Sequence, residues 1–151
     1  MKKYALISLI IASVMLCFCS CSVSFVSDDS VHTSYDGVYI TIDSIDTDGS
    51  DTTLNVSLHN ETELDACYGL GYTVEYNDGG EWKNIQITDF AIPEIACILE
   101  AGGVHERSYS TRYFNMLREG SYRIKIDLYL TEGDESVTVS TFAVFNMEYV
   151  K

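Results

Sequence analysis

Apolar and polar residues alternate along much of the chain, and the longest such run lies towards its C-terminal end. Every second residue of this run is apolar: Tyr122, Ile124, Ile126, Leu128 and Leu130. The intervening positions carry Arg123, Lys125, Asp127 and Tyr129. Because successive side chains of a strand point to opposite faces, this period of two predicts a central strand with one face in a core.

Six further segments are rich in β-branched and aromatic residues, and turn residues separate them. The seven predicted strands cover residues 38–42, 54–58, 72–76, 81–87, 105–113, 121–130 and 137–145. The strongest turn signal is residues 77–80, Asn-Asp-Gly-Gly, which predicts a hairpin. Residues 60–71 are expected to form a loop crossing between sheets, and residues 88–97 an irregular connection around Pro93. Because no helical pattern separates the strands, an antiparallel sandwich is favoured over a parallel sheet.

The central strand is preceded by the spacing of a tyrosine corner. Leu117 lies five residues before Tyr122 and Gly120 two residues before it. In such a corner the phenol hydrogen-bonds to the backbone of its own connection, a feature of immunoglobulin-like folds. The predicted fold is therefore an all-β, Greek-key, immunoglobulin-like sandwich of about seven strands.

The first 20 residues are expected to be a lipoprotein signal peptide. Lys2 and Lys3 precede an apolar run from Ala5 to Phe18, which has the length of a secretory signal rather than of a membrane span. The run ends in a cysteine-rich segment that resembles the lipobox of bacterial lipoproteins. Cys21 follows the small residue Ser20, and we expect it to carry the lipid.

The part of the chain that follows the predicted signal peptide is strongly acidic. Without Lys2 and Lys3 the formal charge changes from −14 to −16, so we expect no binding of nucleic acid or anionic lipid through charge. Residues 21–35 are rich in Ser and Asp and are predicted to be a flexible tether, and residues 36–151 a single domain. The expected location is the membrane surface of a bacterial cell envelope.

Four short motifs together resemble a family of bacterial Ig-like domains found in small lipoproteins. They are the aromatic strand from Tyr72 to Tyr76, the Gly-Gly-Glu-Trp segment ending at Trp82, the Leu-x-x-Gly turn from Leu99 to Gly102, and Leu-x-x-Gly-x-Tyr-Arg from Leu117 to Arg123. Ala101 stands where the family usually has proline. The resemblance implies this fold and export, and it supplies no catalytic residues.

The chain carries no motif that predicts chemistry. The spacing of Asp46, Asp48 and Asp51 is a fragment of a calcium loop, but Ser57 stands where an EF-hand has its bidentate glutamate. His32, His59 and His105 are the only histidines, without zinc-ligand spacing. We therefore expect no metal, no cofactor and no enzyme activity, and an envelope enzyme remains only as an alternative.

Cys67 and Cys97 are the two cysteines beyond the anchor region. In an immunoglobulin-like connectivity they lie at the same end of the sandwich, and an exported location permits oxidation. They are either a disulfide or two small buried hydrophobes, which is the usual state of a free cysteine.

The hairpin from Tyr72 to Ile87 is the candidate binding surface. Tyr72, Tyr76 and Trp82 lie close together in the sequence, and such side chains are enriched where proteins meet. They are equally ordinary cross-strand partners in a sheet. The predicted function is a non-enzymatic module with a protein-binding or accessory role, in which a protein partner contacts this hairpin. The alternative is a carbohydrate-binding module that uses the same Tyr and Trp residues.

Overall fold

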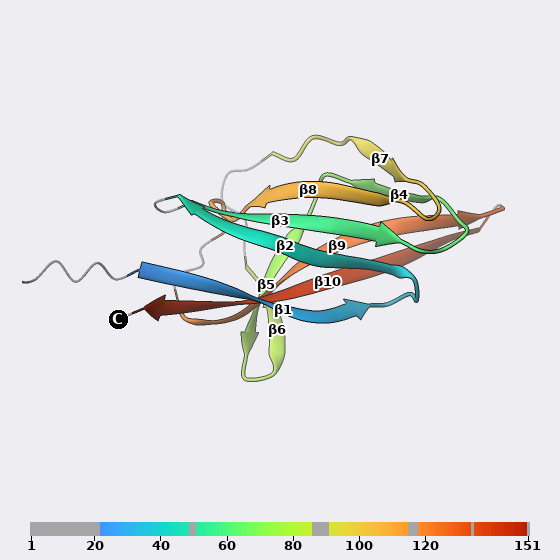
Figure 1. Ribbon diagram of the computed structural model, residues 1–151. Coiled ribbons are helices and arrows are strands. Elements are labelled where there is room, and N and C mark those ends of the chain that lie inside the picture. The colour runs from blue at the N-terminus through green and yellow to red at the C-terminus, as the bar shows by residue number, and fades with distance from the viewer. Residues whose placement is uncertain (1–21, 49–50, 86–90, 115–117, 134, 151) are drawn as a thin grey trace, which may run out of the picture.

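The computed structural model describes residues 22–48, 51–85, 91–114, 118–133 and 135–150. These residues form ten strands in two antiparallel sheets, with no helix among them (Figure 1). The larger sheet contains β1 (Ser22–Thr33), β10 (Glu135–Val150), β9 (Gly120–Glu132), β4 (Ala66–Gly69), β7 (Ala96–Leu99), β5 (Thr73–Asp78) and β6 (Glu81–Asn84). The smaller sheet contains β2 (Val38–Asp48), β3 (Asp51–Asn60) and β8 (Val104–Ser110).

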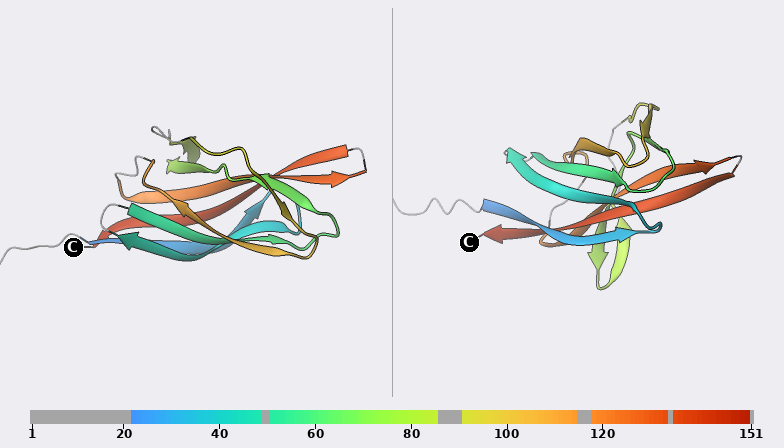
Figure 2. Two further views of the ribbon diagram at one scale, coloured as in Figure 1. Left: turned by 90° about the horizontal axis from the view of Figure 1, so that it is seen from above. Right: turned by 45° about the vertical axis from the view of Figure 1, so that its right-hand side comes forward.

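Strand β9 organises the larger sheet, as its alternation predicts. One edge pairs with β10 along its whole length. The other edge pairs with β5 opposite residues 122–125 and with β4 opposite residues 128–130. The order is therefore β1-β10-β9-β4-β7, with β5 and then β6 beside the first part of β9. The two sheets lie face to face as a sandwich (Figure 2).

The core lies between the two sheets and is built from the apolar faces of their strands. All five apolar residues of the β9 alternation are buried, as are the facing residues of β3 and β10: Leu54, Val56, Leu58, Val139, Ala143, Phe145 and Met147. Each set occupies every second position, so a single face of each strand supplies the core. The predicted immunoglobulin-like sandwich is confirmed.

The N-terminal segment differs from the prediction. Residues 22–33 are strand β1, which pairs with β10 from Ser22 opposite Val150 to Thr33 opposite Thr141. The Ser- and Asp-rich composition indicated a free tether over residues 21–35, and that prediction was wrong for the described part of this range. The open edge of β10 offers backbone donors and acceptors to any extended segment, and this pairing needs no apolar alternation.

Two more strands lie where irregular structure was predicted. Strand β4 lies within the expected loop of residues 60–71, and β7 begins at Ala96, at the end of the expected connection. Each has four residues, and they pair with one another while β4 also pairs with β9. Four residues are too few to show a period in the sequence. Their conformation therefore depends on pairing with a neighbour that is distant in sequence.

A buried asparagine joins the ends of three strands. Asn60 is 1% exposed, and its side-chain amide donates to the carbonyl oxygens of Leu64 (2.7 Å), Leu99 (3.1 Å) and Glu100 (3.1 Å). Its Oδ1 accepts from the Thr62 backbone and hydroxyl. This residue therefore links the carbonyl groups at the end of β7 to the one before β4 through its buried amide.

The tyrosine corner has its expected hydrogen bond. The Tyr122 hydroxyl donates to the Arg118 carbonyl oxygen at 2.8 Å, and the ring packs against Phe145 at 5.6 Å between centroids. Gly120 has φ +146, and an added Cβ would lie 2.7 Å from the ring of Tyr76. Glycine is required there by both the backbone conformation and the close approach of that ring. Leu117, the third residue of the predicted corner, lies outside the described residues.

Candidate functional site

The β5–β6 hairpin stands out from the sandwich (Figure 1). Only residues 73–76 of β5 pair with β9, so the rest of the hairpin extends past the sheet. Gly79 and Gly80 have φ values of 67 and 101, which the tight turn requires, and the Gly80 amide donates to Asn77 Oδ1 at 2.7 Å. Lys83 and Asp78 form an ion pair of 2.6 Å across the hairpin. These contacts lie within the hairpin itself, so they stabilise the part of it that extends past the sheet.

An arginine lies between two aromatic rings on the outer face of the larger sheet, at the base of this hairpin. The Arg123 Cζ is 4.6 Å from the Trp82 ring centroid and 4.2 Å from that of Phe142. Its Nε donates to the Glu75 carboxylate in a short, mostly buried ion pair. These four residues, the outer aromatic cluster, come from β9, β6, β10 and β5. Such a contact between a guanidinium and a ring contributes about 0.5–2 kcal/mol.

The opposite face of the hairpin forms a small pocket above the tyrosine corner. Its volume is about 300 Å³, and Tyr76, Lys83, Arg118 and Tyr122 are among the residues that line it. The Arg118 guanidinium lies 4.4 Å from the Tyr76 ring centroid. Lys83 lowers the pKa of Asp78 by a hydrogen bond and by its charge.

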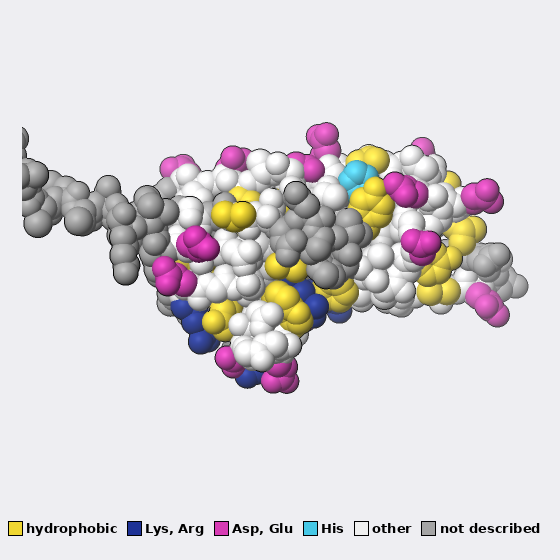
Figure 3. All heavy atoms as spheres, turned by 60° about the horizontal axis from the view of Figure 1, so that its bottom comes forward, with side chains coloured by type: hydrophobic (Ala, Val, Ile, Leu, Met, Phe, Trp, Pro, Cys, Tyr) yellow, Lys and Arg dark blue, Asp and Glu magenta, His cyan; other side chains and the backbone are white. Residues whose placement is uncertain are grey.

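Positive charge is concentrated at this end of an otherwise acidic chain. Four of the six described Lys and Arg residues lie on the hairpin, or on β9 and the turn before it: Lys83, Arg118, Arg123 and Lys125. Figure 3 shows Lys and Arg side chains beside hydrophobic ones at the base of the projection, and Asp and Glu side chains both on the projection and over the rest of that face. The hairpin region is therefore chemically different from its surroundings.

The structure separates the three aromatic residues that the sequence placed on one surface. Tyr72 is 9% exposed, its ring packs on Tyr109 and Phe114, and its hydroxyl donates to the Ser110 carbonyl oxygen. The prediction that Tyr72 contacts a partner was therefore wrong. It lies just before β5, where the chain still passes through the core.

Tyr76 and Trp82 are both half-buried, but they point to opposite faces of the hairpin. The pairing sets Tyr76 opposite Lys83 and Trp82 opposite Asn77. Paired residues share a face and neighbouring residues do not. Of these two residues, only Trp82 belongs to the outer face. Its partners Arg123 and Phe142 lie 41 and 60 residues further along the chain. Sequence reasoning missed both, although Arg123 occupies an outward position of the β9 alternation.

The two cysteines are free thiols. The β4–β7 register sets Cys67 opposite Ile98 and Cys97 opposite Tyr68. Since paired residues share a face, Cys67 points outward while Cys97 points towards the core beside Tyr68. The disulfide alternative is wrong in this structure, because the two thiols lie on opposite faces of one strand pair.

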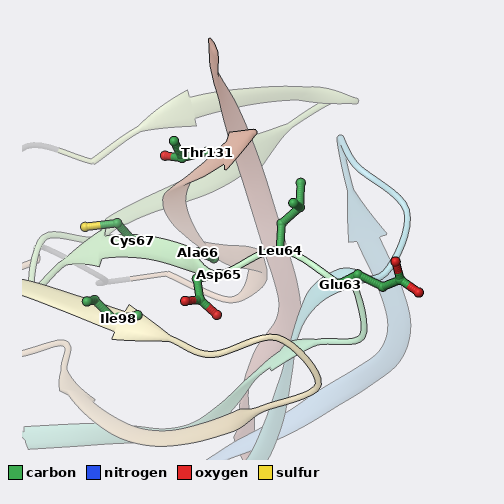
Figure 4. A pocket seen from close by; sticks show the side chains of 7 residues that line it. All are labelled: Glu63, Leu64, Asp65, Ala66, Cys67, Ile98 and Thr131. Carbon is green, nitrogen blue, oxygen red and sulfur yellow. The ribbon is translucent and has the colours of Figure 1, made fainter. Parts of the chain in front are cut away.

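Cys67 lies on the wall of a shallow outer pocket of about 450 Å³ (Figure 4). Glu63, Asp65, Ile98 and Thr131 are among the other residues that line it. Throughout the described ranges, no group of three or more His, Cys, Asp or Glu side chains is arranged to hold a metal ion. Nor do these ranges contain a helix of the length and apolarity that a membrane crossing needs. Cys21 and the predicted signal peptide lie outside the described residues.

Comparison with known proteins gives one result for the fold. The family model described as a bacterial Ig-like domain matches residues 34–142. The match begins just after β1 and covers the strands from β2 to β9 and part of β10. No protein with curated annotation matches the chain.

Proposed function

Because the chain belongs to the bacterial Ig-like domain family, we propose that it is an exported, lipid-anchored, non-enzymatic module that binds a protein partner through its β5–β6 hairpin. Ig-like domains of this kind are typically non-catalytic and are often surface exposed. The single observation that carries the binding role is the projecting hairpin with the outer aromatic cluster at its base.

The outer aromatic cluster has the chemistry of a protein contact surface. Trp and Arg are enriched at the energetic centres of interfaces, and Trp82 and Arg123 are held together here before any partner arrives. The Glu75 carboxylate limits the rotation of the guanidinium. A side chain that is already ordered loses less conformational entropy on binding.

Carbohydrate binding, the other predicted role, receives less support from this geometry. A sugar stacks on an open aromatic face, but the Arg123 guanidinium already lies over the indole of Trp82. Tyr76 is covered by Arg118 in the same way, and Tyr72 is buried. Each of these rings therefore has at least one face that is already covered.

The lipid anchor is proposed at Cys21, the residue before β1. With β1 paired to β10 from Ser22 onwards, a lipid on Cys21 would hold the end of the sandwich that contains Ser22 and Val150 close to the membrane. The hairpin projects sideways from the long axis of the sandwich (Figure 1). This arrangement would present the hairpin to neighbours in the envelope rather than to the lipid surface.

The binding role is tested by site-specific photo-crosslinking in cells, with the crosslinker replacing Asn84 on β6. We expect a discrete protein adduct that Trp82→Ala weakens at least tenfold while the unfolding midpoint changes little. Tyr129→Ala, an exposed aromatic on the outer face of β9 outside the cluster, is the matched control and should leave the adduct intact. An adduct of equal intensity in Trp82→Ala, or unfolding of that variant, would contradict the site.

The anchor is tested separately by membrane fractionation. Cys21→Ser should abolish lipid labelling and release the protein from the membrane fraction. Unchanged fractionation of this variant would refute the lipoprotein assignment without affecting the binding site.

A further inference from the structure

The inward face of β8 is polar, unlike the other faces that line the core. His105, Arg107 and Tyr109 pair with three fully buried residues of β3: Leu58, Val56 and Leu54. Paired residues share a face, so all three side chains point between the sheets. Strand β8 is an edge of the smaller sheet, and inward charge on an edge discourages pairing with other chains. That role explains one charged residue, but it leaves the rest of the arrangement unexplained.

The edge of the larger sheet meets this stripe with further polar groups. The Tyr68 hydroxyl lies 3.0 Å from His105 Nδ1, and the Arg107 Cζ lies 5.5 Å from the centroid of the Tyr68 ring. Cys97 shares the inward face beside Tyr68. Arg107 Nη1 donates to the Glu106 carbonyl oxygen at 3.1 Å. Strands β7 and β8 are the strands that end their sheets, so the guanidinium of Arg107 lies where an edge of the smaller sheet meets an edge of the larger one.

Two buried donors in this stripe lack an acceptor. The Arg107 Nε and the Tyr109 hydroxyl have no hydrogen-bond partner among the described residues, and Tyr109 is only 5% exposed. Such groups lower stability unless a partner satisfies them. Burial raises the pKa of Tyr109, so its hydroxyl stays a donor at all ordinary pH values.

Arg107 also has no carboxylate partner. Four of the six described Lys and Arg side chains have a carboxylate oxygen within 4.0 Å: Lys83, Arg112, Arg123 and Lys125. Within the described ranges Arg107 has no such ion pair, although acidic residues outnumber basic ones by 23 to 9 in the whole chain. The guanidinium interacts with Tyr68 and Cys97, but its Nε lacks an acceptor, as does the neighbouring Tyr109 hydroxyl. These two donors can bind an acceptor that the domain does not itself supply.

We propose that the two donors without acceptors, Arg107 Nε and the Tyr109 hydroxyl on the inward face of β8, bind a carboxylate group that accepts hydrogen bonds from both. A planar carboxylate matches the planar edge of a guanidinium, while the Tyr68 ring supports the guanidinium from one side. The group comes either from a small carboxylic acid or from an acidic side chain of an extended peptide lying along the open strand edges. This site is separate from the hairpin and does not depend on the proposed function.

The test is an NMR titration of the full exported chain carrying Cys21→Ser. Sodium acetate is added at constant ionic strength against sodium chloride, and the Arg107 Nε–Hε signal is followed. We expect a saturable shift of this signal and none for Arg112, which lies against Asp51 at 3.7 Å and provides an internal control. Tyr109→Phe, which keeps the ring packed on Tyr72, should weaken the apparent affinity about tenfold or more. Arg107→Met should abolish the shift elsewhere in the site.

Two further arms identify the source of the carboxylate. A threonine-rich pentapeptide with a central glutamate is compared with its glutamine counterpart, and inorganic phosphate is titrated in parallel. Saturation by acetate, or by the glutamate peptide alone, supports the proposal and identifies the source. Responses equal to those of chloride, responses unchanged in Tyr109→Phe, or tighter binding of phosphate than of either carboxylate would overturn it. Trp82→Ala should leave these responses intact, so the two sites can fail independently.

Discussion

Replacing Tyr122 with phenylalanine removes a single hydroxyl from the centre of the fold. The ring is 1% exposed and packs against Tyr76 at 5.2 Å and Phe145 at 5.6 Å between centroids. Phenylalanine keeps these ring contacts and loses the 2.8 Å hydrogen bond to the Arg118 carbonyl oxygen. Because Arg118 is exposed, water can replace the lost donor there. We therefore expect a cost of about 1 kcal/mol, the middle of the range for a neutral hydrogen bond.

Tyr122→Ala separates the ring from the hydroxyl. Deleting a buried aromatic ring costs about 3–5 kcal/mol, so the alanine variant should lose at least about three times as much stability as the phenylalanine variant. For a domain of this size, the phenylalanine change corresponds to a shift of about 4 °C in the melting temperature. Equilibrium unfolding in urea, followed by circular dichroism and by the fluorescence of the single tryptophan, measures both variants.

Two results of the urea experiment would contradict these expectations. If Tyr122→Phe unfolds at the wild-type midpoint, the corner hydrogen bond contributes nothing to stability. If the phenylalanine variant is as unstable as the alanine variant, the hydroxyl rather than the ring dominates, and the packing account is wrong.

Three further substitutions test other parts of the fold. Gly120→Ala should lower the free energy of unfolding by about 2 kcal/mol, because residue 120 has a φ of +146 and an added Cβ would lie 2.7 Å from Tyr76. In the same urea assay Gly71→Ala, whose Cβ meets nothing within 4 Å, should change it by no more than about 0.5 kcal/mol. Asn60→Asp places a carboxylate against three carbonyl oxygens and should lower the free energy of unfolding by about 3 kcal/mol or more; a melting temperature near that of the wild type would contradict the role of its amide. Burial raises the pKa of Tyr72 from 10.0 to about 12, so the stability contributed by its neutral hydroxyl is present below pH 10 and is lost as the pH rises from 10 to 12. Tyr72→Phe should reduce this loss, and equal slopes of urea midpoint against pH in the variant and the wild type would refute the assignment.

The candidate site shows why only part of a binding surface can be predicted from a sequence. The turn at residues 77–80 was correct because its glycines and its asparagine act through contacts within four residues. Its neighbours Arg123 and Phe142 reach Trp82 only because β6, β5, β9 and β10 lie side by side in that order. Nothing local to Trp82 indicates that order. Likewise, the sequence predicted a strand over residues 105–113 but not its inward-facing polar stripe, since period alone does not show which face of an edge strand meets the other sheet.

The sequence alone determined the class of fold and its centre. The alternation of β9 and the spacing of the tyrosine corner depend on the period of a strand and on a hydrogen bond across four residues, both of which are local. Tertiary structure alone decided that residues 22–33 form β1, that Tyr72 is buried and that Cys67 and Cys97 face apart. Each of these depends on which strands pair and in which register, and that pairing is set by contacts between segments far apart in the chain.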